Sequence, residues 1–269
     1  MIHSTAIIHP SAKIGSGVTI DAYAIIGPDV ILGDKCHIQS HAILEYTDLG
    51  AESIVFPHAS IGLPPQHLKY KGEPTRVKTG ERCTFRESVT VHRGTALDQS
   101  LTSIGNDCYF MALSHVAHDC RIGNNVIMAN GAQLAGHIHI EDFCFISSTV
   151  GIHQFVRIGT SAFISGGAMV PLDVAPFCIA QGDRARIRGL NLVGLRRRGV
   201  KRDSIKAIKE AYRTVFQSGL SLKDALASPA MNVSDEHVAL FRQFFSASKR
   251  GFLRPDAAWT EQQAEEVLS

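Results

Sequence analysis

Residues 104–174 read IGNDCYFMALSHVAHDCRIGNNVIMANGAQLAGHIHIEDFCFISSTVGIHQFVRIGTSAFISGGAMVPLDV. An apolar residue recurs at every sixth position, at Ile104, Phe110, Val116, Ile122, Met128, Leu134, Ile140, Ile146, Ile152, Ile158, Ile164 and Val170. A small or aliphatic residue follows each of them four positions later, from Cys108 to Val174. A period of six drifts out of phase with the 3.6-residue turn of an α-helix and is too short for a hairpin. Each unit therefore fits one short strand followed by one turn.

The six-residue period covers most of the first two thirds of the chain. It also runs from Ile2 to Leu44 and returns in pieces between Leu49 and Val91. Three units of six close a triangular coil of 18 residues, and such coils stack about 4.8 Å apart with aliphatic ladders inside. The sequence thus predicts an all-β fold, a parallel β-helix of hexapeptide repeats. Two breaks in the period predict inserted loops near residues 67–78 and 97–103.

The pattern becomes helical beyond Pro176. Asp203 is expected to be the N-cap of a helix over residues 204–218, and a second amphipathic run covers residues 234–249. We therefore predict a β-helix domain at residues 1–184 and a small C-terminal α-helical domain at residues 185–269. The polar tail at 256–269 is expected to fray or to form a last helix.

The composition indicates a globular protein. The chain has 269 residues, of which 45% are hydrophobic and 19% charged, and no apolar stretch approaches the roughly 18 residues of a membrane helix. The N-terminus lacks the charged and then apolar segments of a signal peptide. We expect a cytoplasmic protein with reduced, buried cysteines and without stable membrane insertion.

Charge is distributed unevenly along the chain. Residues 1–175 carry 11 Lys and Arg against 15 Asp and Glu, whereas residues 184–213 carry 11 basic residues and 2 acidic ones. The second segment predicts an anionic partner. Aromatic residues are not interleaved with its arginines, as stacking platforms for bases would be, so we do not expect nucleic acid as the partner.

Residues 18 apart should lie above one another, so the sequence can be arranged in columns. His118 then shares a column with Gly136 and Gln154. When the residues of the second inserted loop are left out of the count, Arg93 falls in the same column and His92 in the column beside it. Four histidines gather at this edge, His92, His118, His137 and His153, and His115 lies close by. The apolar period does not require such a cluster, which therefore indicates a function.

The residue types at this edge predict acyl transfer. Imidazole is the side chain best suited to accept a proton near neutral pH. Gly136, one coil above His118, offers a backbone N–H to a developing oxyanion. Asp119 is a candidate to orient the base, although neighbouring residues of a strand point to opposite faces, so that contact would need a turn.

Two other interpretations remain open from the residues alone. His115 and His118, or His137 and His139, could bind Zn²⁺ together with a histidine of another subunit, as in a hydratase of the carbonic anhydrase type. A β-helix that serves only as a scaffold is the alternative without catalysis.

Several segments resemble the UDP-N-acetylglucosamine O-acyltransferases that open lipid A biosynthesis. The resemblance covers nearly the whole chain, and it is carried by residues 69–76, 92–95, 114–120, 134–137, 174–182 and 191–199. The family implies a left-handed β-helix, a homotrimer, and transfer of an (R)-3-hydroxyacyl chain from acyl carrier protein to the 3-hydroxyl of UDP-N-acetylglucosamine. It implies no metal, and no cofactor besides the carrier-bound acyl donor as cosubstrate.

The resemblance also assigns roles to individual residues. His118 would be the general base, Asp119 would tune it, and the Gly136 amide would stabilise the oxyanion. Substrate binding would fall to Lys69, His115, His137, His153, Gln154, Asn191, Arg197 and Arg198. The last three would meet the nucleotide from a neighbouring subunit.

Three further positions bear on substrate choice. His67 and Val193 stand where the better-known members carry an acidic residue, so transfer to a nitrogen of a sugar nucleotide, such as a 3-amino UDP-sugar, is the alternative activity. Gly166 matches the position that limits acyl length. Because glycine has no side chain to fill the space, we expect a long chain of about 14 carbons.

Overall fold

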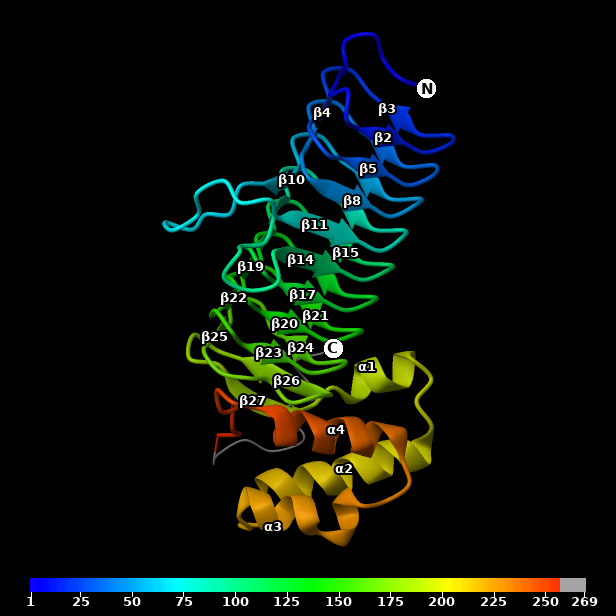
Figure 1. The fold of residues 1–269 in the computed structure, drawn as a ribbon. Helices are drawn as coiled ribbons and strands as arrows, with labels where there is room; N and C mark the ends of the chain where they lie inside the picture. Colours follow the sequence, from blue (N-terminus) through cyan, green and yellow to red (C-terminus); the bar gives the residue numbers. More distant parts are fainter. Residues whose placement is uncertain (257–269) are drawn as a thin grey trace.

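The computed structural model describes residues 1–256, in which a triangular prism of short strands stands on a bundle of helices (Figure 1). Each face of the prism is one sheet. The first sheet contains, in order, β1 (Ile7–Ile8), β4 (Ile25–Ile26), β7 (Ile43–Leu44), β10 (Ser60–Leu63), β13 (Thr90–His92), β16 (His115–Val116), β19 (Gln133–Leu134), β22 (Gly151–Ile152) and β25 (Met169–Val170). The second contains β2 (Lys13–Ile14), β5 (Ile31–Leu32), β8 (Thr47–Leu49), β11 (Arg76–Thr79), β14 (Leu101–Ile104), β17 (Arg121–Ile122), β20 (His139–Ile140) and β23 (Arg157–Ile158).

The third sheet extends to the C-terminal end of the prism. Its strands are β3 (Thr19–Ile20), β6 (His37–Ile38), β9 (Ile54–Val55), β12 (Thr84–Phe85), β15 (Tyr109–Phe110), β18 (Ile127–Met128), β21 (Phe145–Ile146), β24 (Phe163–Ile164), β26 (Cys178–Gln181) and β27 (Arg186–Leu190). Neighbouring strands of the three sheets are parallel, except that β26 and β27 form an antiparallel pair. This pair closes the prism before the first helix.

The register of the strands confirms the columns expected from the sequence. His115 lies beside Gln133, which lies beside Gly151, so the coil repeats after 18 residues. Across the second inserted loop, Thr90 pairs with His115 and Val91 with Val116.

The turns between strands form the three edges of the prism. In most turns a residue other than glycine adopts a positive φ, such as Asp119 at 61°, Phe143 at 60° and Thr149 at 54°. We name the edges by their turns: the catalytic edge (118–119, 136–137 and 154–155), the arginine edge (124–125, 142–143 and 160–161) and the third edge (130–131, 148–149 and 166–167).

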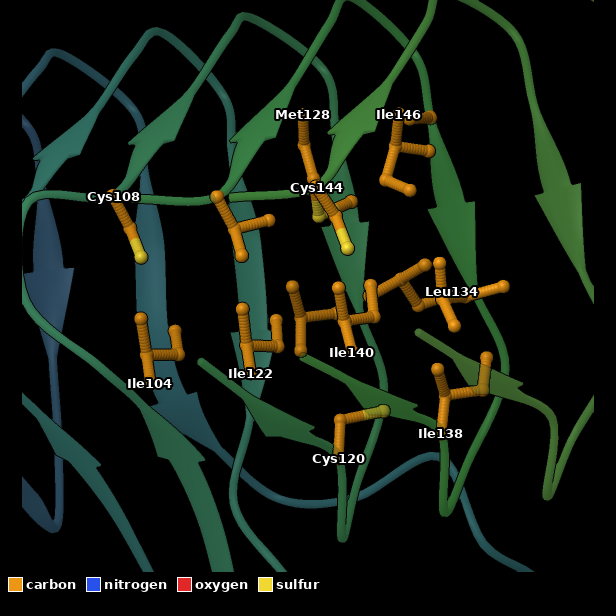
Figure 2. Packing of buried hydrophobic residues seen from close by; sticks show 14 of the residues in the cluster. Ile104, Cys108, Cys120, Ile122, Met128, Leu134, Ile138, Ile140, Cys144 and Ile146 are labelled. Carbon is orange, nitrogen blue, oxygen red and sulfur yellow. The ribbon is translucent and has the colours of Figure 1, made fainter. Parts of the chain in front are cut away.

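The core is the stack of aliphatic ladders inside the prism. Ile104, Ile122 and Ile140 follow one another in a row (Figure 2), and each is at most 4% exposed. All six cysteines are buried and free. Because burial of apolar surface contributes about 25 cal/mol per Å², repetition of such rows in every coil stabilises a fold in which most strands are only two residues long.

The C-terminal region is helical. It contains α1 (Leu192–Arg197), α2 (Arg202–Phe216), α3 (Leu222–Ala227), the 3₁₀-helix η1 (Pro229–Met231) and α4 (Glu236–Ala247). The expectation that Asp203 is the N-cap is wrong, because Lys201 holds that position. Asp203 lies in the first turn of α2, where its charge complements the helix dipole. Of the tail at 256–269, residues 257–269 lie outside the described residues.

Both inserted loops differ in extent from the sequence prediction. The first projects from the prism and ends before β11 begins at Arg76, so it covers residues 64–75 instead of 67–78 (Figure 1). The second starts after β13 ends at His92 and stops before β14 begins at Leu101, so it covers 93–100 instead of 97–103. The polar strands β11 (RVKT) and β14 (LTSI) lack the usual hexad pattern but pair with each other in full register.

Candidate active site

His118 and Asp119 form a hydrogen-bonded pair in the turn after β16. Nδ1 of His118 is 2.8 Å from Oδ2 of Asp119. The contact forms because the φ of 61° at Asp119 turns its carboxylate back toward the preceding side chain, which an extended strand would not do. Since an ionised carboxylate only accepts hydrogen bonds, Nδ1 of His118 carries the proton and Nε2 is the basic atom.

Asp119 is 2% exposed and has further donors around it. The N–H and the hydroxyl of Thr95 donate to its two oxygens at 2.8 and 2.7 Å. Burial by itself raises the pKa of Asp119, but the hydrogen bonds from His118 and Thr95 outweigh it and hold the pKa below its ordinary value. Asp119 is therefore an anion near neutral pH, suited to orient His118 and to stabilise its protonated form.

Gly136 packs against the imidazole of His118. A β-carbon on residue 136 would lie 2.6 Å from Cε1 and 2.9 Å from Nε2 of His118. No group within residues 1–256 accepts a hydrogen bond from the Gly136 N–H. A backbone N–H that has no partner and lies beside a base can stabilise a developing oxyanion by a hydrogen bond.

A cavity of about 640 Å³ opens beside His118 and Gly136. Much of its wall is apolar or lacks a side chain, and this part includes Leu134, Ala135, Gly151, Ile152, Met169 and Val170. A β-carbon on Gly151 would lie 2.7 Å from the sulfur of Met169, so glycine allows the Met169 side chain to pack there. An apolar cavity that adjoins a base and an oxyanion donor suits an acyl chain.

His137 and His115 have fixed positions beside the base. Nδ1 of His137 lies 3.2 Å from Oδ2 of Asp98, and its ring stacks on Phe155 with the centroids 4.5 Å apart. His115 lines the cavity and shares a 2.7 Å hydrogen bond with the hydroxyl of Thr90. Each histidine therefore keeps Nδ1 engaged within the protein, and Nε2 of His137 lies 3.8 Å from Oδ2 of Asp119.

His153 and His92 complete the cluster. Arg250 donates to Nδ1 of His153 at 2.9 Å, and Gln154 follows at the exposed corner. His92 is buried against His115, with ring centroids 5.2 Å apart. Burial, followed by the neighbouring cationic groups, lowers the pKa of His92 to about 4, so it is neutral at physiological pH. The structure thus brings together the four histidines that the columns place at one edge and His115 close by.

The first inserted loop reaches over the base. Gln66 lines the cavity, and the ring of His67 meets the ring of His118 edge-on, with centroids 5.2 Å apart. Lys69 is exposed near the loop tip, and its backbone N–H donates to Nδ1 of His67 at 3.3 Å.

Gln66, Thr95 and Asp98 also belong to the site, although the sequence did not point to them. All three lie in the inserted loops, where no period relates a residue number to a position in space. No signal in the chain itself singles them out.

A second cavity, of about 520 Å³, lies at the arginine edge. Asn191, Arg197 and Arg198 line it together with Phe143 and Ser161. The Arg198 guanidinium stacks over the Phe143 ring at 3.7 Å and donates to the Ser161 hydroxyl. Burial lowers the pKa of Arg198, which means that its charge is partly withdrawn from water. Two arginines at one cavity suit an anionic ligand.

The predicted site residues do not all meet within one chain. The catalytic edge carries His118, Asp119 and Gly136, whereas Arg197 and Arg198 line the cavity at the arginine edge. Gly166 lies at the third edge, where its β-carbon would be 3.6 Å from the Ser148 carbonyl oxygen, and it does not line the cavity beside His118.

Metal binding was the competing chemical interpretation of these histidines. Within residues 1–256, one set of ligand atoms lies close enough for a shared ion, on His118, Asp119 and His137, all within 4.8 Å of one another. His115 and His139, which the sequence paired with these histidines, do not belong to it. The Nδ1 atoms of His118 and His137 are hydrogen-bonded to carboxylates, an arrangement that suits proton transfer.

Comparison with known proteins tests these interpretations. Residues 173–253 match a family model described as Udp N-acetylglucosamine O-acyltransferase, domain 2, and residues 11–45 and 101–136 match the bacterial transferase hexapeptide repeat. An acyl-[acyl-carrier-protein]–UDP-N-acetylglucosamine O-acyltransferase of Thermodesulfovibrio yellowstonii is 46% identical over 94% of this chain and 99% of its own length. One of Campylobacter concisus is 43% identical over 93% and 96% of the two chains. This chain belongs to the UDP-N-acetylglucosamine O-acyltransferase family.

Solved structures of this family have the same fold. The UDP-N-acetylglucosamine acyltransferase of Francisella novicida superposes with a TM-score of 0.93 at 36% identity, covering 98% of both chains. That of Campylobacter jejuni gives 0.91 at 38% identity, covering 95% of this chain and 100% of its own. The β-helix is left-handed, as the resemblance implied.

Family membership decides between the activities left open by the residues. The chain is an acyltransferase, and neither the metal-dependent hydratase nor the sugar-nucleotide N-acyltransferase is favoured. Within residues 1–256, no helix has the length and apolar character to cross a bilayer.

Proposed function

We propose that this acyltransferase moves an (R)-3-hydroxyacyl chain from acyl carrier protein to the 3-hydroxyl of UDP-N-acetylglucosamine, the first step of lipid A biosynthesis. The observation that carries the proposal is the joint position of an oriented imidazole, a backbone N–H without a partner and an apolar cavity at one edge of the prism. The names of the relatives supply the two substrates.

The proposed reaction begins with proton removal. Nε2 of His118 takes the proton of the sugar hydroxyl while Asp119 stabilises the resulting imidazolium through Nδ1. The hydroxyl oxygen forms a bond to the thioester carbonyl carbon, and the Gly136 N–H donates to the oxyanion. Collapse of this intermediate breaks the carbon–sulfur bond, and the departing thiolate takes the proton from the imidazolium. The base is thereby regenerated.

The two cavities suit the two substrates of the proposed reaction. We place the acyl chain along the apolar wall beside His118, with its carbonyl at Gly136. The sugar would lie among His115, His137 and His153, with Gln154 and Lys69 at the margin. We place the diphosphate and nucleoside at Asn191, Arg197 and Arg198 of a neighbouring subunit, because these residues lie at a different edge from the base.

This division of the site is the reason to propose a homotrimer. A three-fold axis parallel to a triangular prism can bring the catalytic edge of one copy against another edge of the next, three times over. The separation of His118, Arg198 and Gly166 on three edges of one chain supports such an arrangement. We expect the enzyme to act in the cytoplasm, with no metal and no cofactor besides the carrier-bound cosubstrate.

The basic segment at 184–213 supports a role in docking the carrier protein. Arg196, Arg202 and Lys209 line one hollow of α1 and α2. An acidic carrier protein would be attracted to such a surface over distances comparable to the Debye length, about 8 Å at physiological ionic strength.

Mass spectrometry of the product tests the proposal. Purified enzyme receives a mixture of 3-hydroxyacyl carrier proteins together with UDP-N-acetylglucosamine and, separately, its 3-amino analogue. We expect one acyl group on the sugar nucleotide, attached by an ester that mild base removes. A base-stable amide as the main product would show N-acyl transfer, and no acylated sugar nucleotide from either acceptor would overturn the proposal.

A further inference from the structure

We propose that Arg93 and Tyr70 are positioning residues that hold the inserted loop 64–75 over the catalytic base. The inference rests on the proposed function, because its kinetic consequence concerns the acceptor sugar nucleotide. It assigns a role to a buried arginine that neither the hexad pattern nor the reaction chemistry uses.

Arg93 lies where the loop leaves and rejoins the prism. It is 7% exposed, and its Nη1 donates to the carbonyl oxygen of Gly62 at 2.8 Å. Its backbone N–H donates to the carbonyl of Leu63 at 3.2 Å, and the next N–H, of Gly94, donates to the carbonyl of Arg76 at 3.3 Å. Two consecutive residues thus fix both ends of the loop.

The guanidinium of Arg93 also reaches into the loop. Its Nε and Nη2 both donate to the hydroxyl oxygen of Tyr70, at 3.1 and 2.9 Å. The same hydroxyl donates to the carbonyl of Glu73 at 2.9 Å. The Tyr46 ring lies 4.3 Å from the guanidinium carbon, and a carboxylate oxygen of Glu45 lies 3.7 Å from Nη1. Arg93 is therefore fixed from several sides, and it presents two donors to one phenol oxygen.

Tyr70 transmits this position to the residues above the base. Its backbone N–H donates to the carbonyl of His67 at 3.0 Å, which closes a tight turn. The ring of His67 then meets the ring of His118, and the preceding Gln66 lines the cavity. The path from Arg93 through Tyr70 to His67 consists of direct contacts throughout.

The loop needs such an anchor because it has no structure of its own. No residue from 64 to 75 belongs to a strand or helix, and Leu68, Lys69 and Lys71 are exposed. A segment of this kind orders only if contacts offset its conformational entropy. Loss of the phenol hydroxyl should leave the loop attached but mobile, so that His67 and Lys69 no longer meet the acceptor in fixed positions.

Tyr70→Phe tests the proposal, with Tyr109→Phe as the matched control. Tyr109 also accepts a hydrogen bond from an arginine, Nη1 of Arg86 at 2.9 Å, but belongs to β15, away from the loop. We expect Tyr70→Phe to raise the KM for UDP-N-acetylglucosamine at least fivefold, with the KM for the acyl donor and the Tm close to wild type. Amide exchange of a peptide covering residues 64–75 should become severalfold faster. Tyr109→Phe should change none of these quantities.

Arg93→Lys is the second variant, since lysine keeps the charge but cannot direct two donors at one oxygen. It should reproduce the faster exchange of the loop. Equal KM values and equal exchange rates for Tyr70→Phe and Tyr109→Phe would overturn the proposal. Failure of the wild-type enzyme to acylate UDP-N-acetylglucosamine would count against the proposed function. The exchange measurement needs no substrate, so the amide exchange rates of the loop would still decide the role of Arg93 and Tyr70.

Discussion

The imidazole of His118 occupies the space that a side chain on residue 136 would need. A β-carbon there would lie 2.6 Å from Cε1 of His118, closer than packed carbon atoms approach one another. Residue 136 is therefore glycine for a steric reason as well as for the access that it gives to its N–H. The same contact fixes one face of the base, and Asp119 fixes its rotation.

Gly136→Ala should lower kcat about 100-fold, the magnitude typical of losing one oxyanion donor. The added methyl displaces the base and covers the N–H. Steady-state kinetics and thermal melting of the variant check this prediction, and a Gly136→Ala enzyme with wild-type kcat would contradict the oxyanion role.

His118→Ala should reduce kcat by at least about 10³-fold, because general base catalysis is worth 10²- to 10⁴-fold. Asp119→Asn should lower kcat about 100-fold, since a neutral amide cannot stabilise the imidazolium. The mass of the assembly and the Tm should remain near those of wild type for His118→Ala, whose side chain lies at the edge and not in the aliphatic core. Activity retained by His118→Ala would eliminate the mechanism.

Gly166→Met should shift the preferred acyl chain from about 14 to about 10 carbons by filling the space at the third edge. The position does not line the cavity of its own chain, so the effect requires that a neighbouring subunit bring the acyl chain there. Competition between carrier-bound donors of different length measures the shift. An unchanged preference for the long chain would refute both the length limit and this placement of the chain.

Raising the ionic strength should raise the KM for acyl carrier protein, because salt screens the attraction to the basic segment at 184–213. The KM for UDP-N-acetylglucosamine should respond less, since a diphosphate bound against Arg198 would lie within one Debye length of its charge. Initial rates at several salt concentrations separate the two effects. A carrier KM that is indifferent to ionic strength would argue against electrostatic docking.

His92 should make the folded enzyme less stable in acid. Its pKa is lowered from 6.5 to about 4, so between these values the unfolded chain binds a proton that the folded chain does not. Stability from this residue is therefore lost as the pH falls from about 6.5 toward 4. Melting curves should show that the Tm falls less between pH 7 and pH 5 for His92→Gln than for wild type, with a difference of a few degrees. An equal drop would show that His92 does not titrate in this way.

The sequence alone predicted the prism and most of the catalytic edge. An unbroken period of six from Ile104 to Val170 excludes a helix and leaves one strand and one turn per unit. Once the coil length is known, arithmetic places Gly136 one coil from His118 and brings the other histidines near. A regular repeat converts sequence separation directly into position, which is why these residues could be found without a structure.

Only the tertiary structure decided the contacts that make the edge reactive. The pairing of His118 with Asp119 depends on a positive φ in one turn, which the residue types did not reveal. Gln66, His67, Thr95 and Asp98 come from inserted loops, where the period gives no information and long-range contacts such as that between Arg93 and Tyr70 set the path of the chain. The position of Arg198 on a different edge of the prism from the base also became clear only from the structure. It depends on the edge at which the repeats end and the helices begin.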